Sequence, residues 1–171
     1  MYQQVILDHA KHPAHRGEQE RFDVEVHHVN PTCGDEITLR VRLDAGTGAR
    51  DGADASVGGE PLVGEITWTG QGCSISQASA SVMAQAVSGR PLDRALALSA
   101  DFRTLMDSRG VLPDGFDADG ELEDAVAFVG VARYPARIKC ALLGWAAMKD
   151  AVAQAAAART THDQQDDEEA R

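Results

Sequence analysis

Residues 30–35 read Asn30-Pro31-Thr32-Cys33-Gly34-Asp35, and they place a thiol and a carboxylate two residues apart. The glycine between them can take backbone angles closed to other residues, so the chain can turn tightly and direct both side chains to one spot. A thiolate and a carboxylate at one point suit a divalent metal ion. This stretch therefore predicts a tight turn that carries part of a metal site.

The chain on either side of this turn alternates between apolar and polar residues. The apolar positions are Phe22, Val24 and Val26 before the turn, and Ile37, Leu39, Val41 and Leu43 after it. A period of two predicts half-buried strands, and two such strands joined by a short link form an antiparallel hairpin. Cys33 is therefore expected at the tip of a hairpin, where a reactive group is exposed and able to move.

A third strand is predicted further along the chain. Ile66 and Trp68 alternate with polar residues up to Gly70, whereas residues 44–61 have no apolar period and are expected to form a long loop. Three strands with one apolar face need helices to cover that face. The expected fold class is therefore α+β, with a small three-stranded antiparallel sheet covered on one face by several helices.

Helices are predicted wherever apolar residues recur at helical spacing. These stretches are residues 1–10, 75–87, 92–106 and 121–132, and a last helix that follows Pro135. Ser74 or Ser76 is expected to cap the second of these helices. Residues 108–120 break the pattern with several glycines among acidic residues, and they are expected to form an inserted surface segment.

Composition limits the classes of function. With 171 residues the chain is expected to form one domain over residues 1–157, followed by an acidic disordered tail at residues 158–171. No stretch approaches the ~20 apolar residues that span a membrane, and the N-terminus does not resemble an export signal, so a cytoplasmic protein with no membrane contact is expected. The net charge of −11 argues against nucleic acid as a partner.

The three cysteines stand in similar local settings. Cys73 follows Gly70-Gln71-Gly72 at a predicted helix start, where the helix dipole favours thiolate, and Cys140 ends Arg137-Ile138-Lys139-Cys140 soon after Pro135. Free cysteines are often inert core residues, and on composition alone that reading is as good as a metal site. The position of each cysteine at the end of an element, beside Gly or Pro, favours one shared site.

Three histidines form a second candidate for metal binding. His9, His12 and His15 follow one another at spacings of three residues near the N-terminus. The spacing is loose for a metal site, and a solvated surface segment explains it better.

The three cysteine motifs together resemble one known family. Asn-Pro-Thr-Cys-Gly-Asp, Gly-Gln-Gly-Cys-Ser-Ile-Ser and Arg-Ile-Lys-Cys-Ala, in this order, resemble the IscU/SufU and NifU N-terminal-like family of iron–sulfur cluster assembly proteins, over residues 1–157. The IscU branch has a histidine directly before its last cysteine, whereas this chain has Lys139, as the SufU branch does. The segment at residues 108–120 is similar to the SufU insertion, so the resemblance is to SufU-type proteins.

This resemblance implies a zinc site formed by Cys33, Asp35, Cys73 and Cys140. It also implies a zinc-dependent sulfurtransferase, with Cys33 accepting persulfide sulfur from a pyridoxal-phosphate cysteine desulfurase of SufS type and with downstream Suf scaffold proteins as further partners. Arg137 is expected to support the site or partner docking. The alternatives are a scaffold on which an iron–sulfur cluster is built on the same cysteines, and a structural zinc domain in which Cys33 is chemically idle.

Overall fold

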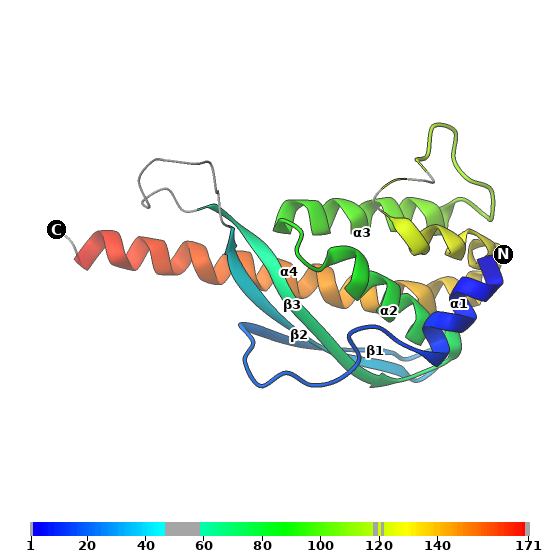
Figure 1. Cartoon of the computed structure of the whole chain (residues 1–171), viewed down its shortest axis with the longest axis horizontal. Helices are drawn as coiled ribbons and strands as arrows, with labels where there is room; N and C mark the ends of the chain where they lie inside the picture. The colour runs from blue at the N-terminus through cyan, green and yellow to red at the C-terminus, as the bar shows by residue number, and fades with distance from the viewer. Residues whose placement is uncertain (1, 47–58, 118–119, 121, 170–171) are drawn as a thin grey trace.

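The computed structural model describes residues 2–46, 59–117, 120 and 122–169, with residues 159–169 as backbone only. Its elements in chain order are α1 (Tyr2–Lys11), β1 (Val24–Asn30), β2 (Asp35–Gly46), β3 (Gly59–Gln71), α2 (Ser74–Val87), α3 (Leu92–Asp107), the 3₁₀ helix η1 (Glu123–Arg133) and α4 (Pro135–Glu169). The two ends of the chain lie at opposite ends of the molecule (Figure 1).

The three strands form one antiparallel sheet in the order β1-β2-β3, as the sequence predicts. Helix α4 packs against β1 and β2, while α2 and α3 pack against β3, so the helices share one face of the sheet (Figure 1). The core lies between these layers, and its largest fully buried side chains include Trp145, Phe102, Phe128 and Leu39. The predicted α+β fold is confirmed.

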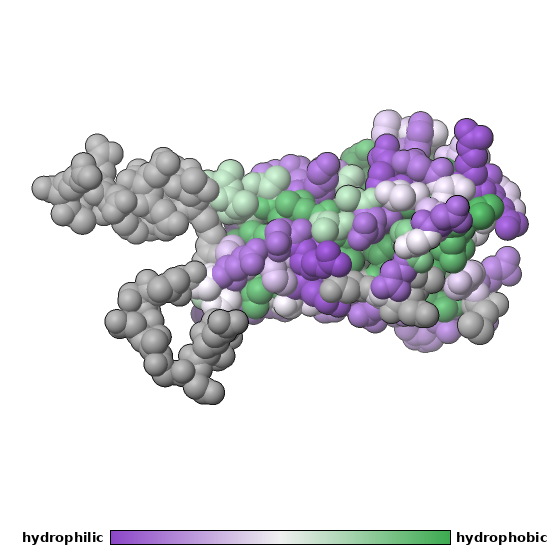
Figure 2. Space-filling view, turned by 90° about the horizontal axis from the view of Figure 1, so that it is seen from above, coloured by the Kyte–Doolittle hydropathy of each residue, from purple (hydrophilic) through white to green (hydrophobic). Residues whose placement is uncertain are grey.

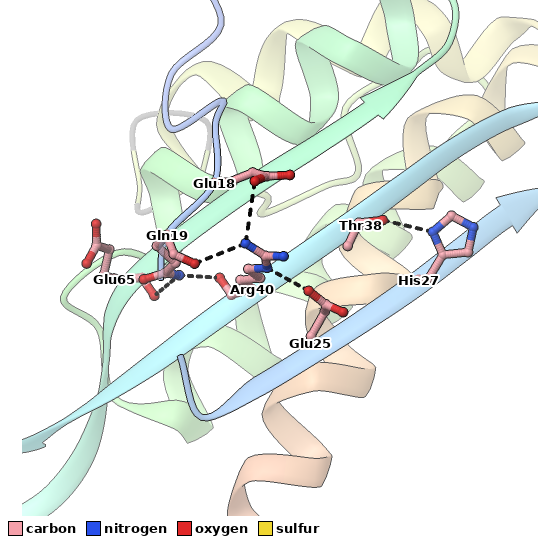
Figure 3. Close-up of polar contacts among 7 residues, drawn as sticks. All are labelled: Glu18, Gln19, Glu25, His27, Thr38, Arg40 and Glu65. Atoms are coloured by element: carbon pink, nitrogen blue, oxygen red, sulfur yellow. Dashed lines mark hydrogen bonds and ion pairs between the residues drawn. The ribbon is translucent and has the colours of Figure 1, made fainter. Parts of the chain in front are cut away.

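The other face of the sheet is polar and is crossed by the segment that follows α1. Arg40 on β2 pairs with Glu25 on β1 at 2.6 Å, and it exchanges hydrogen bonds with Gln19: Nη1 donates to the Gln19 carbonyl at 3.0 Å, and Gln19 Nε2 donates to the Arg40 carbonyl at 2.8 Å (Figure 3). These bonds attach the segment to the sheet.

Two sequence predictions need correction. The loop expected over residues 44–61 is wrong at both ends, because β2 runs to Gly46 and β3 begins at Gly59, and these two residues pair with each other. Cross-strand hydrogen bonds there outweigh the low strand propensity of glycine. Residues 47–58 lie outside the described part of the chain. The helix expected over residues 121–132 is a 3₁₀ helix from Glu123 to Arg133.

The last helix is longer than the predicted domain. The boundary expected at residue 157 lies within α4, which continues as one helix to Glu169, and the division into domain and tail stays a prediction. Among the described residues, no helix is both long enough and apolar enough to cross a membrane. The space-filling view shows hydrophobic patches between hydrophilic areas on the helical side of the surface (Figure 2).

Candidate metal centre

The hairpin tip is built by Asn30 and Gly34. Asn30 pairs with Asp35, so β1 and β2 are joined by only four residues. The Gly34 N–H donates to the Asn30 carbonyl at 2.8 Å, the Thr32 N–H donates to Asn30 Oδ1 at 3.1 Å, and Gly34 has φ +74°, a left-handed angle that glycine adopts at little cost. The tip leaves Cys33 exposed and Asp35 buried.

Cys73 lies directly before the first turn of α2 and contacts Asp35. Its backbone N–H donates to Asp35 Oδ1 at 3.2 Å, and its Sγ lies 3.5 Å from Asp35 Oδ2. The predicted serine cap is wrong, because Cys73 occupies the N-cap position without a side-chain cap bond and the Ser76 hydroxyl donates to the Cys73 carbonyl at 2.9 Å. The carboxylate from the hairpin therefore stands at the positive end of α2.

Cys140 comes from the second turn of α4 and is only 3% exposed. Its Sγ lies 3.5 Å from Cys33 Sγ and 3.8 Å from the carbonyl of Ala136. Cys33, Asp35 and Cys140 each offer a ligand atom within 4.8 Å of the other two, and Cys73 joins them through Asp35. The structure thus gathers the four residues named from the sequence at one end of the sheet.

The pKa values of Asp35 and Cys140 shift in opposite directions within this cluster. Burial, followed by the contact with Cys33, raises the pKa of Cys140 far above that of an ordinary thiol. Burial also raises the pKa of Asp35, but hydrogen bonds, first among them those with Cys33 and Cys140, outweigh it and leave this pKa below its usual value. Without a cation, Asp35 is therefore ionised while Cys140 stays protonated.

The donor set of this cluster fits a zinc ion. Three sulfurs and one carboxylate are ligands that zinc accepts in a tetrahedral site, and a cation among them would favour the thiolate form of Cys140, which burial opposes. The same sulfurs also suit iron–sulfur clusters. Lys139 and Arg137, exposed beside Cys140 on α4, add positive charge near a set of anionic ligands.

Arg137 belongs to a feature that the sequence does not reveal. It lines a cavity of about 540 Å³ between α1, the start of α2, the end of η1 and the start of α4, together with the exposed side chains of Tyr2 and Tyr134. Ser74, the neighbour of Cys73, is also part of the lining. Tyr2 and Tyr134 lie far apart in the sequence, so their contribution to one cavity could not be predicted from it. Only the packing of the helices brings them together.

The histidines near the N-terminus have a structural explanation. His9 contacts Ser81 Oγ on α2 at 2.7 Å through Nδ1 and Asp124 Oδ2 on η1 at 3.1 Å through Nε2. These bonds fasten α1 to the helical layer. Within the described residues, the group able to hold a metal contains none of the three histidines, and His12 and His15 are exposed.

Comparison with known proteins gives a consistent family. A family model described as the NifU-like N terminal domain matches residues 1–141. The zinc-dependent sulfurtransferase SufU of Bacillus subtilis (strain 168) is 38% identical over 154 residues, which cover 90% of this chain and 90% of that protein. The iron–sulfur cluster assembly scaffold protein IscU of Streptococcus pyogenes serotype M1 is 36% identical over 164 residues, which cover 96% of this chain and 90% of that protein.

A solved structure supports the same assignment of fold. The N-terminal part of a nitrogen-fixing NifU-like protein from Brucella abortus superposes with a TM-score of 0.70 at 25% identity, covering 90% of this chain and 93% of that chain.

Proposed function

Because this chain belongs to the family of NifU-like N-terminal domains, which includes SufU and IscU proteins of iron–sulfur cluster assembly, we propose that it is a zinc-dependent sulfurtransferase. In this proposal it accepts the outer sulfur of a persulfide on a pyridoxal-phosphate cysteine desulfurase of SufS type and passes it on to Suf scaffold proteins. The likeness to the Bacillus subtilis sulfurtransferase supports the zinc-dependent form of the proposal.

One observation carries the proposal: an exposed thiol stands on a four-residue turn, in contact with the buried thiol of Cys140 and beside Asp35 and Cys73. Cys33 is exposed, its sulfur lies 3.5 Å from that of the buried Cys140, and Asp35 and Cys73 complete the group. A thiol that is both accessible and held beside metal ligands can be protected in one position and reactive in another.

The proposed step is a thiol–persulfide exchange at Cys33. The Cys33 thiolate attacks the outer sulfur of the desulfurase persulfide, the bond between the two desulfurase sulfurs breaks, and its electron pair leaves on the desulfurase cysteine as thiolate. The proton of the persulfide stays with the transferred sulfur, so Cys33 now carries the persulfide. When bound, zinc would supply charge that keeps the ligand thiols ionised and the four ligands together.

Arg137 is proposed as a docking residue for the desulfurase rather than as a residue in contact with the transferred sulfur. It is exposed, it lies one helical turn before Cys140, and it borders the cavity that Ser74, the neighbour of Cys73, also lines. In an assay of alanine release by the desulfurase, Arg137→Ala should raise the half-saturating concentration of this protein, and an unchanged value would remove Arg137 from the interface.

The same assay tests the acceptor. With Cys33→Ala, alanine release should fall to the rate of the desulfurase alone, while circular dichroism shows that the fold survives. Thr32→Ala is the matched control, because it changes an exposed residue of the same tip and should retain stimulation. Full stimulation by Cys33→Ala would overturn the assignment of Cys33.

A scaffold for a nascent iron–sulfur cluster is the second candidate function. It is favoured by the name of the Streptococcus pyogenes relative, and the three thiols suit iron as well as zinc. Lys139, where a histidine ligand stands in the IscU branch, counts against it. Metal and acid-labile sulfide are therefore measured in protein purified without oxygen or chelators: about one zinc per chain supports the sulfurtransferase, and iron with sulfide supports the scaffold.

A further inference from the structure

Gly72 lies against the Asp35 carboxylate with no room for a side chain. A Cβ atom at this position would be 2.9 Å from Asp35 Cγ and 3.0 Å from Asp35 Oδ1, and it would overlap Ser76 Oγ. Gly72 is not among the glycines with positive φ, so its φ is not one that requires glycine. Glycine is needed at position 72 because the absence of a side chain lets the Asp35 carboxylate approach, not because of its backbone angles.

Ser76 closes the same space from the first turn of α2. It is 6% exposed, and its hydroxyl donates to the Cys73 carbonyl at 2.9 Å. The point beside Gly72 that lies 2.9 Å from Asp35 Cγ also overlaps Ser76 Oγ, so the hydroxyl and the carboxylate border one space. The carboxylate is thus enclosed by a glycine, an amide and a hydroxyl from one short stretch.

The two oxygens of Asp35 then differ in their surroundings. Oδ1 accepts the Cys73 N–H at 3.2 Å and lies where Gly72 has no side chain, whereas Oδ2 lies 3.5 Å from Cys73 Sγ. A carboxylate that is fixed through one oxygen presents the other in a defined direction, as outer hydrogen bonds do for metal-binding carboxylates in general.

We infer that Gly72 and Ser76 are positioning residues that hold the Asp35 carboxylate in the orientation in which it binds the metal. This inference rests on the proposed function, because it takes Asp35 as a zinc ligand. It assigns two roles to the hairpin tip. Asp35 is the fixed end, held by the start of α2, and Cys33 is the exposed end, which we expect to move during sulfur transfer.

The test compares substitutions that crowd or loosen this enclosure with matched substitutions that do not. Gly72→Ala places a methyl group against the carboxylate, and Ser76→Ala removes the hydroxyl while retaining the helix. Gly130→Ala is the control for the first, because a Cβ there meets no atom within 4 Å, and Ser74→Ala is the control for the second, because Ser74 is exposed in the same turn.

Three measurements are made on the full chain: zinc affinity by competition with a chromogenic chelator, the visible absorption bands of the Co²⁺-loaded protein, and the melting temperature of the metal-free protein. Gly72→Ala and Ser76→Ala should each weaken zinc binding by about 10–100-fold per folded chain and shift the Co²⁺ bands. Both should also lower the metal-free melting temperature somewhat, because Gly72→Ala crowds Ser76 and Ser76→Ala removes a buried hydrogen bond. The controls should stay within about twofold of wild type.

The outcomes separate this inference from the proposed function. If wild type binds zinc and both enclosure variants match their controls in affinity and in Co²⁺ spectrum, Gly72 and Ser76 do not position Asp35 and the sulfurtransferase proposal stands. Loss of metal-free stability with affinity per folded chain unchanged would also overturn the inference, because the role is then structural only. Failure of wild type to bind zinc or Co²⁺ overturns both.

Discussion

The sulfur atoms of Cys33 and Cys140 lie 3.5 Å apart, yet they belong to two very different regions of the molecule. Cys33 is exposed on a turn of four residues, whereas Cys140 is 3% exposed on a helix that packs across the sheet. The same chemical group is therefore exposed on a short turn, where we expect it to move, on one side of the contact, and it is held in the core on the other. This difference suits a site in which one thiol accepts sulfur while the others keep the ligands in place.

The contacts behind each sulfur explain the difference. The tip is shaped by two hydrogen bonds to Asn30 and by the backbone angle of Gly34. The helix is held by buried side chains: Trp145 stacks on Phe102 with ring centroids 4.6 Å apart, and the hydroxyl of Ser79 donates to the carbonyl of Ala141 at 2.6 Å. Moving Cys140 would disturb the core, whereas moving Cys33 would disturb the turn and its contact with Cys140.

Removal of the fixed thiol should have the largest effect. Cys140→Ala should lose zinc and the increase in melting temperature that zinc provides, and it should also cost about 1 kcal/mol in the metal-free protein, because a buried sulfur is removed. Cys33→Ala, made at the exposed thiol, should leave metal-free stability unchanged. Melting curves with and without zinc measure both effects, and equal metal-free stability of the two variants would contradict the contrast between fixed and free thiols.

The packing beneath the fixed thiol can be weakened without touching a ligand. Trp145→Ala should lower the free energy of unfolding by about 3–5 kcal/mol, because it removes a fully buried ring that stacks on Phe102. Urea denaturation of the metal-free protein measures this loss, with Lys149→Ala, an exposed position of the same helix, as the control. A loss below about 1 kcal/mol would mean that α4 is not held by this ring.

The mobile side of the contact depends on Gly34. Gly34→Ala should destabilise the metal-free protein by roughly 1–2 kcal/mol, because a residue with a Cβ pays for the left-handed angle that glycine adopts there. It should also slow sulfur acceptance at Cys33, since the turn becomes stiffer. Urea denaturation and alanine release measure the two effects, and Thr32→Ala is the control within the tip. Stability equal to that control would show that the turn relaxes to another conformation.

The smallest effect is expected where the two regions are joined by a surface contact. His28 Nε2 on β1 lies 3.1 Å from Asp150 Oδ2 on α4, and hydrogen bonding to His28 and then to Gln154 lowers the pKa of Asp150. A carboxyl with a lowered folded pKa stabilises the fold fully above its unfolded pKa of about 4, and this contribution is lost as pH falls through the lowered value.

Asp150→Asn should therefore be slightly less stable than wild type at about pH 6, and this difference should shrink below about pH 4. Urea midpoints across this range provide the measurement, with Asp101→Asn, at an exposed carboxyl of α3, as the control. A difference that does not change with pH would mean that the charge of Asp150 does not contribute to the link between α4 and β1.

Much of the fold could be predicted because its signals are local. Alternation on both sides of residues 30–35 predicted the β1–β2 hairpin with Cys33 at its tip, and helical spacing predicted α2 and α3. The prediction failed where distant contacts override local preference. Gly46 and Gly59 extend β2 and β3 because they pair with each other across the sheet. Cys73, rather than a serine, occupies the N-cap position of α2, and its N–H donates to the Asp35 carboxylate.

The sequence by itself named the candidate site residues and determined which elements they stand on, because backbone periodicity and turn residues act over a few positions of the chain. Only the tertiary structure decided that Cys33, Asp35, Cys73 and Cys140 meet, which of the thiols is exposed, and that Gly72 makes room for the carboxylate. These features join residues that are far apart in the chain: Asp35 and Cys73 are 38 positions apart, and Cys33 and Cys140 are 107 positions apart. Their positions depend on the packing of α4 and the other helices against the sheet. Burial of apolar surface drives this packing, and it stabilises the fold as a whole.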